Sequence, residues 1–210
     1  MNSCNNKQKA AQQAREKAIA DSVQQREAFV RDSTQRELEL YIDSITKVEA
    51  AEKEETIKKY KKSFDEQYDE FQEITWVKPK NRPEFINQNA MYAYFCIKDE
   101  KPCNFRFRFQ YFDDDWLFVK KMIFNIDGDN ITITPSMKRD CNSSGIWEYC
   151  DVHIHLMGEI TESFIERLVE AKTVKVRLYG KYSDTRNITK RQLETLKNTY
   201  EYYKALGGKF

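Results

Sequence analysis

The chain has 210 residues, 33% of them charged, and its 35 lysines and arginines nearly balance 34 aspartates and glutamates. The net charge of +1 excludes a protein whose whole surface attracts polyanions. No apolar stretch is long enough to cross a membrane as a helix. The sequence also lacks a CxxC zinc motif, a GxSxG nucleophile motif and a glycine-rich phosphate loop, so few of the common catalytic sites remain open.

The first residues contain a cysteine preceded by a small residue, Ser3–Cys4. This pair resembles the end of a bacterial lipoprotein signal, in which the cysteine carries the lipid. Lipidation of Cys4 would anchor the protein in the bacterial cell envelope, facing the periplasm or the cell surface, with the membrane as a partner. The charged and apolar regions of such a signal do not precede Cys4. Either a longer precursor supplies them, or Cys4 is an ordinary cysteine and the protein is cytoplasmic.

Residues 6 to about 73 contain no proline or glycine and are rich in helix-forming side chains. Apolar residues recur there at spacings of three and four, at Leu38, Tyr41, Ile45 and Val48, and again at Tyr60, Phe64, Tyr68 and Phe71. We expect a helical stalk over residues 1–72, whose second apolar set docks on the following domain. A coiled coil that joins copies of the chain is one alternative, although its heptads fail at Glu52 and Glu55. A helix break near Thr34 is another, because this residue starts a capping-box pattern.

The second domain is predicted over residues 73–210, which contain all the prolines and glycines. Alternation of apolar and polar residues predicts strands at 91–98 and 103–111. The aromatic residues of the second strand are expected to share one buried face: Phe105, Phe107, Phe109 and Tyr111. Arg106 and Arg108 alternate with them, but two arginines in a near-neutral chain do not predict a nucleic-acid partner.

The pairing of these two strands predicts which side chains meet. The loop between them places Cys96 opposite Cys103. Regular antiparallel pairing then gives the next two pairs, Tyr94 with Phe105 and Tyr92 with Phe107. On this prediction the tyrosines extend the aromatic core.

More strands are expected elsewhere in the second domain. A short strand is expected within residues 73–85, before a turn through Pro79 and Pro83. Another strand should begin at Trp116 and be disturbed at Lys120–Lys121. The run Asp127–Asn130 predicts a tight turn after it, and Ile131 and Ile133 resume the apolar face beyond that turn. The segments 146–156 and 173–180 show the alternation of half-buried strands.

Two helices complete the second domain. One is predicted over residues 162–172, and the other begins at the capping box Thr189–Gln192 and ends at Gly207. We therefore predict an α+β protein, in which a long N-terminal helix precedes an antiparallel β-sandwich-like domain of about seven strands with two helices.

Cys4 apart, the cysteines form two pairs that are close in the sequence. Each pair flanks a predicted turn, and we predict the disulfides Cys96–Cys103 and Cys141–Cys150. Such bridges require an oxidising compartment, as the envelope location would provide.

Three polar side chains alternate with aliphatic ones near residue 153: Asp151, His153 and His155. Residues two apart on a strand share a face, so the two histidines could chelate a metal ion with Asp151. A metal-dependent hydrolase centred on His153 and His155 is therefore the alternative function. Burial of the intervening Val152, Ile154 and Leu156 favours the other outcome, in which the histidines face solvent and no metal or cofactor is bound.

Several short motifs of the second domain carry a resemblance to a family: Ile74–Trp76 with Lys78–Pro79, Asp115–Phe118, Gly145–Glu148, Val174–Gly180 and Tyr203–Gly208. Over residues 68–210 they resemble an uncharacterised domain of lipoproteins from gut bacteria and their mobile elements. The resemblance implies a fold and an envelope location, and it brings no catalytic residues. We therefore expect a lipid-anchored, non-catalytic binding module with a protein partner, and a homo-oligomer if the N-terminal helix pairs with a second copy.

Overall fold

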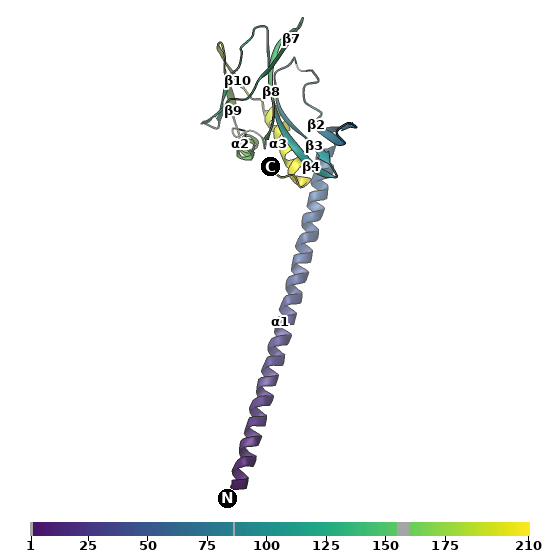
Figure 1. Cartoon of the computed structure of the whole chain (residues 1–210), viewed down its shortest axis with the longest axis vertical. Helices are drawn as coiled ribbons and strands as arrows, with labels where there is room; N and C mark the ends of the chain where they lie inside the picture. Colours follow the sequence, from purple (N-terminus) through teal and green to yellow (C-terminus); the bar gives the residue numbers. More distant parts are fainter. Residues whose placement is uncertain (1, 86, 155–159) are drawn as a thin grey trace. The chain divides into compact units, whose positions relative to one another are not determined.

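The structure, a computed structural model, describes residues 2–85, 87–154 and 160–210 (Figure 1). Before Ser22, only the side chains of Arg15 and Lys17 are described. The chain divides into two compact units, Met1–Lys53 and Glu54–Phe210. The predicted α+β class is confirmed, because a long helix precedes two antiparallel sheets and two further helices.

Helix α1 (Asn2–Lys61) is continuous, so the alternative of a break near Thr34 is not borne out. The hydroxyls of Ser33 and Thr34 instead donate to the Val30 carbonyl within the helix. All described side chains from Ser22 to Lys53 are exposed, including the apolar residues of the first predicted stripe.

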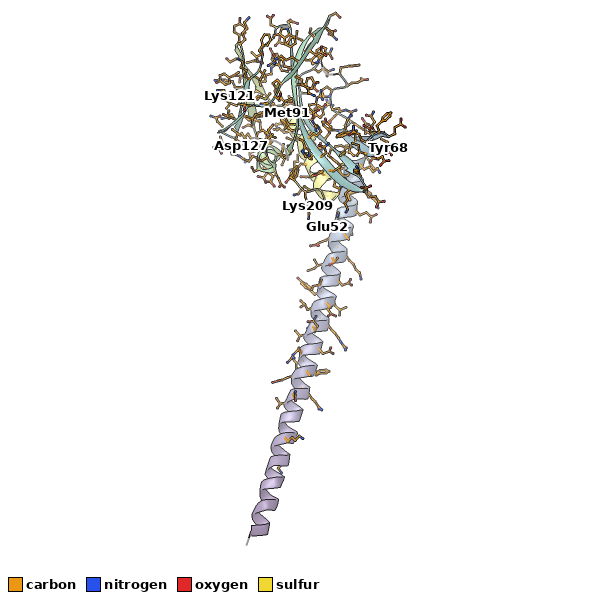
Figure 2. All side chains as sticks on the ribbon, in the orientation of Figure 1. Glu52, Tyr68, Met91, Lys121, Asp127 and Lys209 are labelled. Carbon is orange, nitrogen blue, oxygen red and sulfur yellow. The ribbon has the colours of Figure 1, made fainter. Side chains whose placement is uncertain are left out.

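The helix ends at Lys61, twelve residues before the predicted end near residue 73. Strand β1 (Phe64–Asp69) follows and pairs with β2 (Ile74–Pro79). The Asp69 carboxylate accepts the backbone N–H groups of Phe71 and Gln72, and this local bonding stabilises a turn where the sequence pattern predicted helix. Tyr60 and Phe64 are buried, but Tyr68 and Phe71 are 65% and 92% exposed and do not dock. Tyr68 is labelled in Figure 2.

Removal of residues 5–53 is expected to leave the melting temperature of the second unit nearly unchanged. The described side chains of the removed part are exposed, and Ile57 and Tyr60, which pack on the core, are kept. A chain that starts at Phe64 is the control. It loses the Tyr60 ring, 6.3 Å from that of Tyr202, and should unfold with about 3 kcal/mol less free energy. Equal losses in the two truncated proteins would show that the first unit is part of the core.

The second unit contains a six-stranded and a four-stranded sheet, both antiparallel. The six-stranded sheet has the order β1-β2-β3-β4-β8-β7, with β3 (Ala90–Lys98), β4 (Lys101–Asp113), β7 (Lys138–Asn142) and β8 (Gly145–His153). The four-stranded sheet has the order β10-β9-β5-β6, with β5 (Lys121–Ile126), β6 (Asp129–Ile133), β9 (Val174–Tyr179) and β10 (Ser183–Asn187). The strands missed by the sequence patterns, β1, β7 and β10, all lie at sheet edges and consist mostly of polar residues, so they lack the apolar alternation that predicts a strand.

The aromatic face of β4 forms the centre of the core, as predicted. Phe105 contacts Tyr203 of helix α3 (Lys190–Ala205), at 5.1 Å between ring centroids. Phe107 contacts Phe164 of helix α2 (Glu162–Glu170), and Phe109 contacts Phe124 of β5. The inner face of the six-stranded sheet is therefore covered in turn by α3, α2 and the second sheet, and its other face stays free of them.

Two local sequence signals are found at the predicted places. The predicted turn is shorter than expected, because Ile126 pairs with Asp129 and both Asp129 and Asn130 belong to β6. Asp127 and Gly128 form a two-residue hairpin loop with φ values of +50° and +103°. Thr189 and Gln192 form the predicted capping box of α3.

Buried tyrosines predict loss of stability at alkaline pH. Burial and the Glu201 carboxylate, which accepts the hydroxyl of Tyr60, raise the pKa of Tyr60 to about 12. Burial chiefly raises the pKa of Tyr203 to about 12. These pKa values exceed that of an unfolded tyrosine, about 10, so the stabilisation is complete below pH ~10 and is lost as the pH rises toward 12. The tyrosinate absorbance of the buried tyrosines should therefore rise together with loss of near-ultraviolet circular dichroism. Full tyrosine ionisation in a folded protein would contradict this expectation.

Candidate binding site

The pairing of β3 with β4 contains an irregularity that changes one face of the sheet. Cys96 lies opposite Cys103, as predicted. From this pair to the next, β3 advances by two residues and β4 by three, so Tyr94 lies opposite Arg106. Asn104, within the longer step, has a φ of +51°, a conformation common in β-bulges. The predicted pairs are therefore wrong by one position: Tyr94 with Phe105 and Tyr92 with Phe107.

Because of this bulge, the tyrosines of β3 share a face with the arginines of β4. We call this side of the six-stranded sheet, opposite the core, the outer face. Its side chains come from β2, β3, β4 and β8: Trp76, Lys78, Tyr92, Tyr94, Arg106, Arg108, Gln110, Tyr149, Asp151 and His153. The face combines aromatic rings with cations, which is a common composition of binding surfaces.

Asp151 organises the centre of the outer face. Its carboxylate accepts hydrogen bonds from Arg106 Nε at 2.6 Å, from Arg108 Nη1 at 3.0 Å and from the Tyr94 hydroxyl at 2.6 Å. The Asp151 side chain is only 11% exposed, so these charge-assisted bonds are shielded from solvent. Burial and the neighbouring Asp151 carboxylate raise the pKa of Tyr94 well above its usual range, which keeps its hydroxyl a donor. Two guanidinium groups share one carboxylate, and one positive charge remains in excess.

Arg108 is held from three sides. Besides its bond to Asp151, its Nε donates to the Gln110 side-chain oxygen at 2.8 Å, and its guanidinium lies 4.5 Å from the ring centroid of Tyr149. Gln110 is itself buried and donates to the Gln88 carbonyl. A side chain fixed in this way is pre-organised, so a ligand would not have to order it on binding.

The connection from β2 to β3, residues 80–89, passes close to one end of the outer face, and we call it the strap. Arg82 ties it to β1 through Asp65 at 2.8 Å, and Asn81 donates to the Thr195 hydroxyl of α3. At its other end, Asn89 exchanges two hydrogen bonds with the backbone of Phe112. A cavity of about 260 Å³ lies between the strap and the outer face, and we call it the smaller cavity.

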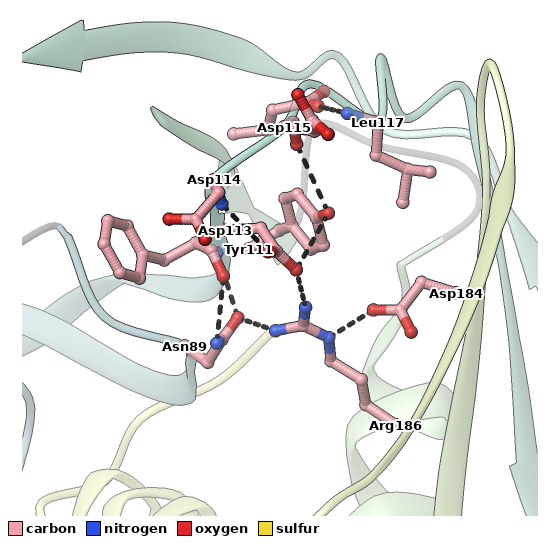
Figure 3. A network of polar contacts seen from close by, with 10 residues as sticks. Asn89, Tyr111, Asp113, Asp114, Asp115, Leu117, Asp184 and Arg186 are labelled. Carbon is pink, nitrogen blue, oxygen red and sulfur yellow. Dashed lines mark hydrogen bonds and ion pairs between the residues drawn. The ribbon is translucent and has the colours of Figure 1, made fainter. Parts of the chain in front are cut away.

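A larger cavity, of about 500 Å³, lies on the other side of the Arg82–Glu84 segment and reaches the beginning of α3. Arg186 of β10 lines it and forms ion pairs with Asp113 and Asp184 (Figure 3). The same guanidinium also donates to Asn89. Two carboxylates therefore compensate this arginine, which joins the second sheet to the end of β4 as a structural contact.

The predicted metal ligands do not form a site in the part of the chain that the structure describes. His153 lies on the outer face opposite Arg106, and its aliphatic neighbours Val152 and Ile154 are buried, as predicted. The oxygens of Asp151 are occupied by two arginines and a tyrosine. No group of three His, Cys, Asp or Glu side chains with the spacing of a metal site is found among the described residues. The predicted His155 and Leu156 lie outside them.

The two predicted disulfides differ in their geometry. All four of these cysteines are thiols, but the sulfur atoms of Cys96 and Cys103 lie 2.7 Å apart. Cys141 is exposed and pairs with Ile146, four residues along β8 from the buried Cys150. This offset corresponds to about 13 Å of strand, too far for a bridge, so the structure does not fit the predicted Cys141–Cys150 disulfide.

Cys96 and Cys103 are expected to form a disulfide when the protein meets an oxidising dithiol–disulfide exchange partner. Loss of two protons and two electrons to that partner's disulfide would join sulfurs that already touch. A bridge that closes a loop of this size contributes about 2–3 kcal/mol in the chain-entropy model. Peptide mapping of unreduced protein should find the Cys96–Cys103 link and alkylated Cys150. Recovery of alkylated Cys96 and Cys103 from oxidised protein would refute the bridge.

The sequence patterns missed Tyr92, Tyr94 and Lys78 as members of the outer face. For the two tyrosines the available signal was Asn104, because asparagine tolerates positive φ better than most residues and often marks an irregular pairing.

Comparisons with models of protein families, with curated proteins and with solved structures found no match. No helix in the described part of the chain has the length and apolar character needed to span a membrane. The side chain of Cys4, the predicted lipid site, lies outside the described residues.

Proposed function

We propose that the protein is an envelope-anchored, non-catalytic binding module whose second unit recognises its ligand through the outer face and the smaller cavity. The observation that carries this proposal is the network around Asp151, which fixes two arginines and a tyrosine on a sheet face that the core does not use. Exposed charges that serve solubility alone need no such ordering. A recognition surface gains from it, because fewer side chains lose freedom when the ligand binds.

The state of the ionisable groups supports binding rather than catalysis. Burial raises the pKa of the Cys150 thiol to about 12, so almost none of it is the nucleophilic thiolate at neutral pH. The pKa of Tyr94 is raised beyond the range useful for acid–base catalysis, and both carboxylate oxygens of Asp151 accept hydrogen bonds from the protein. These groups hold one another in place.

The location of the ligand site can be tested by photo-crosslinking in cells that naturally contain the protein. A photoreactive phenylalanine derivative at Tyr149 keeps the ring beneath Arg108 and places the reactive group on the outer face. The matched position is Thr132, an exposed residue of β6 in the other sheet. An adduct of defined mass from position 149 alone supports the proposal. No adduct, or equal adducts from both positions, would reject it.

The anchor is tested separately, on the natural precursor. Acylation of Cys4 by two chains would give stable membrane attachment, whereas a single chain attaches only marginally. Mass spectrometry should find the diacylated cysteine in the membrane fraction, and a Cys4→Ser variant should move to the soluble fraction. An unmodified Cys4 in protein made from its natural start would remove the envelope from the proposal and leave the binding site unaffected.

A further inference from the structure

We propose that the smaller cavity binds a compact anionic group, a carboxylate or a phosphate, between Lys78, Arg108 and the Tyr92 hydroxyl. This inference rests on the proposed function, since it names the chemistry of the ligand for the same cavity. Three features of the cavity support it: the charges of its lining, the hydrogen-bond donors that are available to a ligand, and its volume.

The charges around the cavity are not balanced by the protein. Lys78, Arg82 and Arg108 line it, together with one exposed carboxylate, Glu84. Arg82 is paired with Asp65, and Arg108 shares its carboxylate with a second arginine. Within the described residues, Lys78 forms no ion pair and no hydrogen bond, and its ammonium lies 5.9 Å from the ring centroid of Tyr94. A cation in this position lacks the anion that would compensate it.

Lys78 occupies a site that its own surroundings make unfavourable for a cation. The side chain is half-buried on β2. Burial lowers the pKa of Lys78, and the positive charges of Arg82 and Arg108 lower it further, with only Asp151 opposing them. An apolar residue there would avoid this energetic cost. Groups held in unfavourable surroundings are concentrated at functional sites, and a bound anion would remove the repulsion.

Three hydrogen-bond donors around the cavity are available to an anion. Arg108 uses Nε and Nη1 within the protein, and its Nη2 makes no hydrogen bond in the described part of the chain. The hydroxyl of the buried Tyr92 likewise has no partner among the described residues. Together with the Lys78 ammonium, these donors come from the adjacent strands β2, β3 and β4. Carboxylates and phosphates accept several such charge-assisted bonds at once.

The size of the cavity favours a small charged group. Its volume of about 260 Å³ lies below the roughly 300–1,000 Å³ of sites that enclose a drug-sized ligand. Phe85 of the strap and Tyr94 also line it and provide apolar surface beside the charges. The anionic group would therefore enter the cavity while the rest of the ligand lies along the outer face.

Binding is tested on the full chain by calorimetry and thermal unfolding, with inorganic phosphate and acetate as probes and chloride at equal ionic strength as reference. The wild type should bind at least one probe, and at ten times the dissociation constant its melting temperature should rise by about 3–5 °C. Lys78→Met should weaken binding at least tenfold. The matched variant is Lys121→Met, because Lys121 (labelled in Figure 2) is half-buried over the Tyr179 ring on the second sheet. It should bind like the wild type.

The two probes distinguish the sources of the negative charge: binding of phosphate alone indicates a phosphorylated ligand, and binding of acetate alone a carboxylate. Tyr92→Phe removes one donor without removing a charge, and it should weaken binding about fivefold even if Lys78→Met does not fold. Absence of binding, or equal loss in the Lys78 and Lys121 variants, overturns this inference. A photo-crosslinked adduct at position 149 without anion binding would reject only the anion site. Anion binding without a crosslinked adduct would reject the proposed partner-binding function.

Discussion

Replacement of Glu148 by glutamine is expected to lower the free energy of unfolding by about 3–5 kcal/mol, because it breaks a buried charge network. The Glu148 side chain is fully buried. Its carboxylate accepts the backbone N–H groups of Leu117, Phe118 and Val119 at 2.9, 2.6 and 2.8 Å. It also accepts Arg139 Nε at 3.0 Å. A glutamine amide would turn its own N–H groups toward these donors and leave the arginine without its counter-charge.

The measurement is chemical denaturation of the variant and of a control that removes an exposed ion pair. Asp129→Asn is suitable, because Asp129 and its partner Arg167 are 78% and 43% exposed. Exposed pairs contribute about 0–1 kcal/mol, so the control should unfold nearly like the wild type. If Glu148→Gln also stayed within about 1 kcal/mol of the wild type, the network would not be what holds the segment Leu117–Val119.

This segment also shows why part of the fold could not be predicted. The alternation after Trp116 favoured a strand from that residue onward, but β5 begins only at Lys121. Residues 116–120 instead pass from the six-stranded sheet to the four-stranded one, with Phe118 at a φ of +54°. Their backbone donors are satisfied by a carboxylate about thirty residues further along the chain. The periodicity of a few neighbouring residues cannot predict a hydrogen bond to such a distant partner.

Features that depend on near neighbours were predictable. The capping box at Thr189 and the Asp127–Gly128 hairpin loop each involve residues at most three positions apart. The aromatic stripe of β4 was predictable for the same reason, because its period of two is a local property. The early end of α1 was not, because the competing state of Phe64–Asp69 is a strand paired with β2.

Some residues of the candidate site could likewise be predicted from local patterns, and others could not. The placement of Arg106, Arg108 and His153 away from the core follows from the parity of their strands. Regular pairing predicts the neighbouring tyrosines in the core. This prediction is wrong, because one extra residue at the bulge reverses the parity on β4. The shared carboxylate of Asp151 could not be inferred at all, since it depends on β8 lying next to β4.

Replacement of Gly180 by alanine is expected to destabilise the protein by at least about 3 kcal/mol through the same segment. A Cβ atom on Gly180 would lie 2.0 Å from the Leu117 carbonyl oxygen and 2.6 Å from that of Phe118. These are backbone atoms, and they cannot move aside easily. The Glu148 carboxylate accepts the N–H groups of Leu117 and Phe118, and the Lys181 N–H donates to the Leu117 carbonyl at 2.6 Å.

The matched control is Gly207→Ala, at the end of α3. Gly207 has a φ of +91°, and a Cβ atom added there would meet no other atom within 4 Å, so alanine introduces conformational strain alone, about 1 kcal/mol. Combining Gly180→Ala with Glu148→Gln should cost less than the sum of the two, because each variant releases the same segment. A Gly180 variant no less stable than the Gly207 variant would show that the segment can shift, and strict additivity in the double variant would show that Glu148 and Gly180 act on separate parts of the fold.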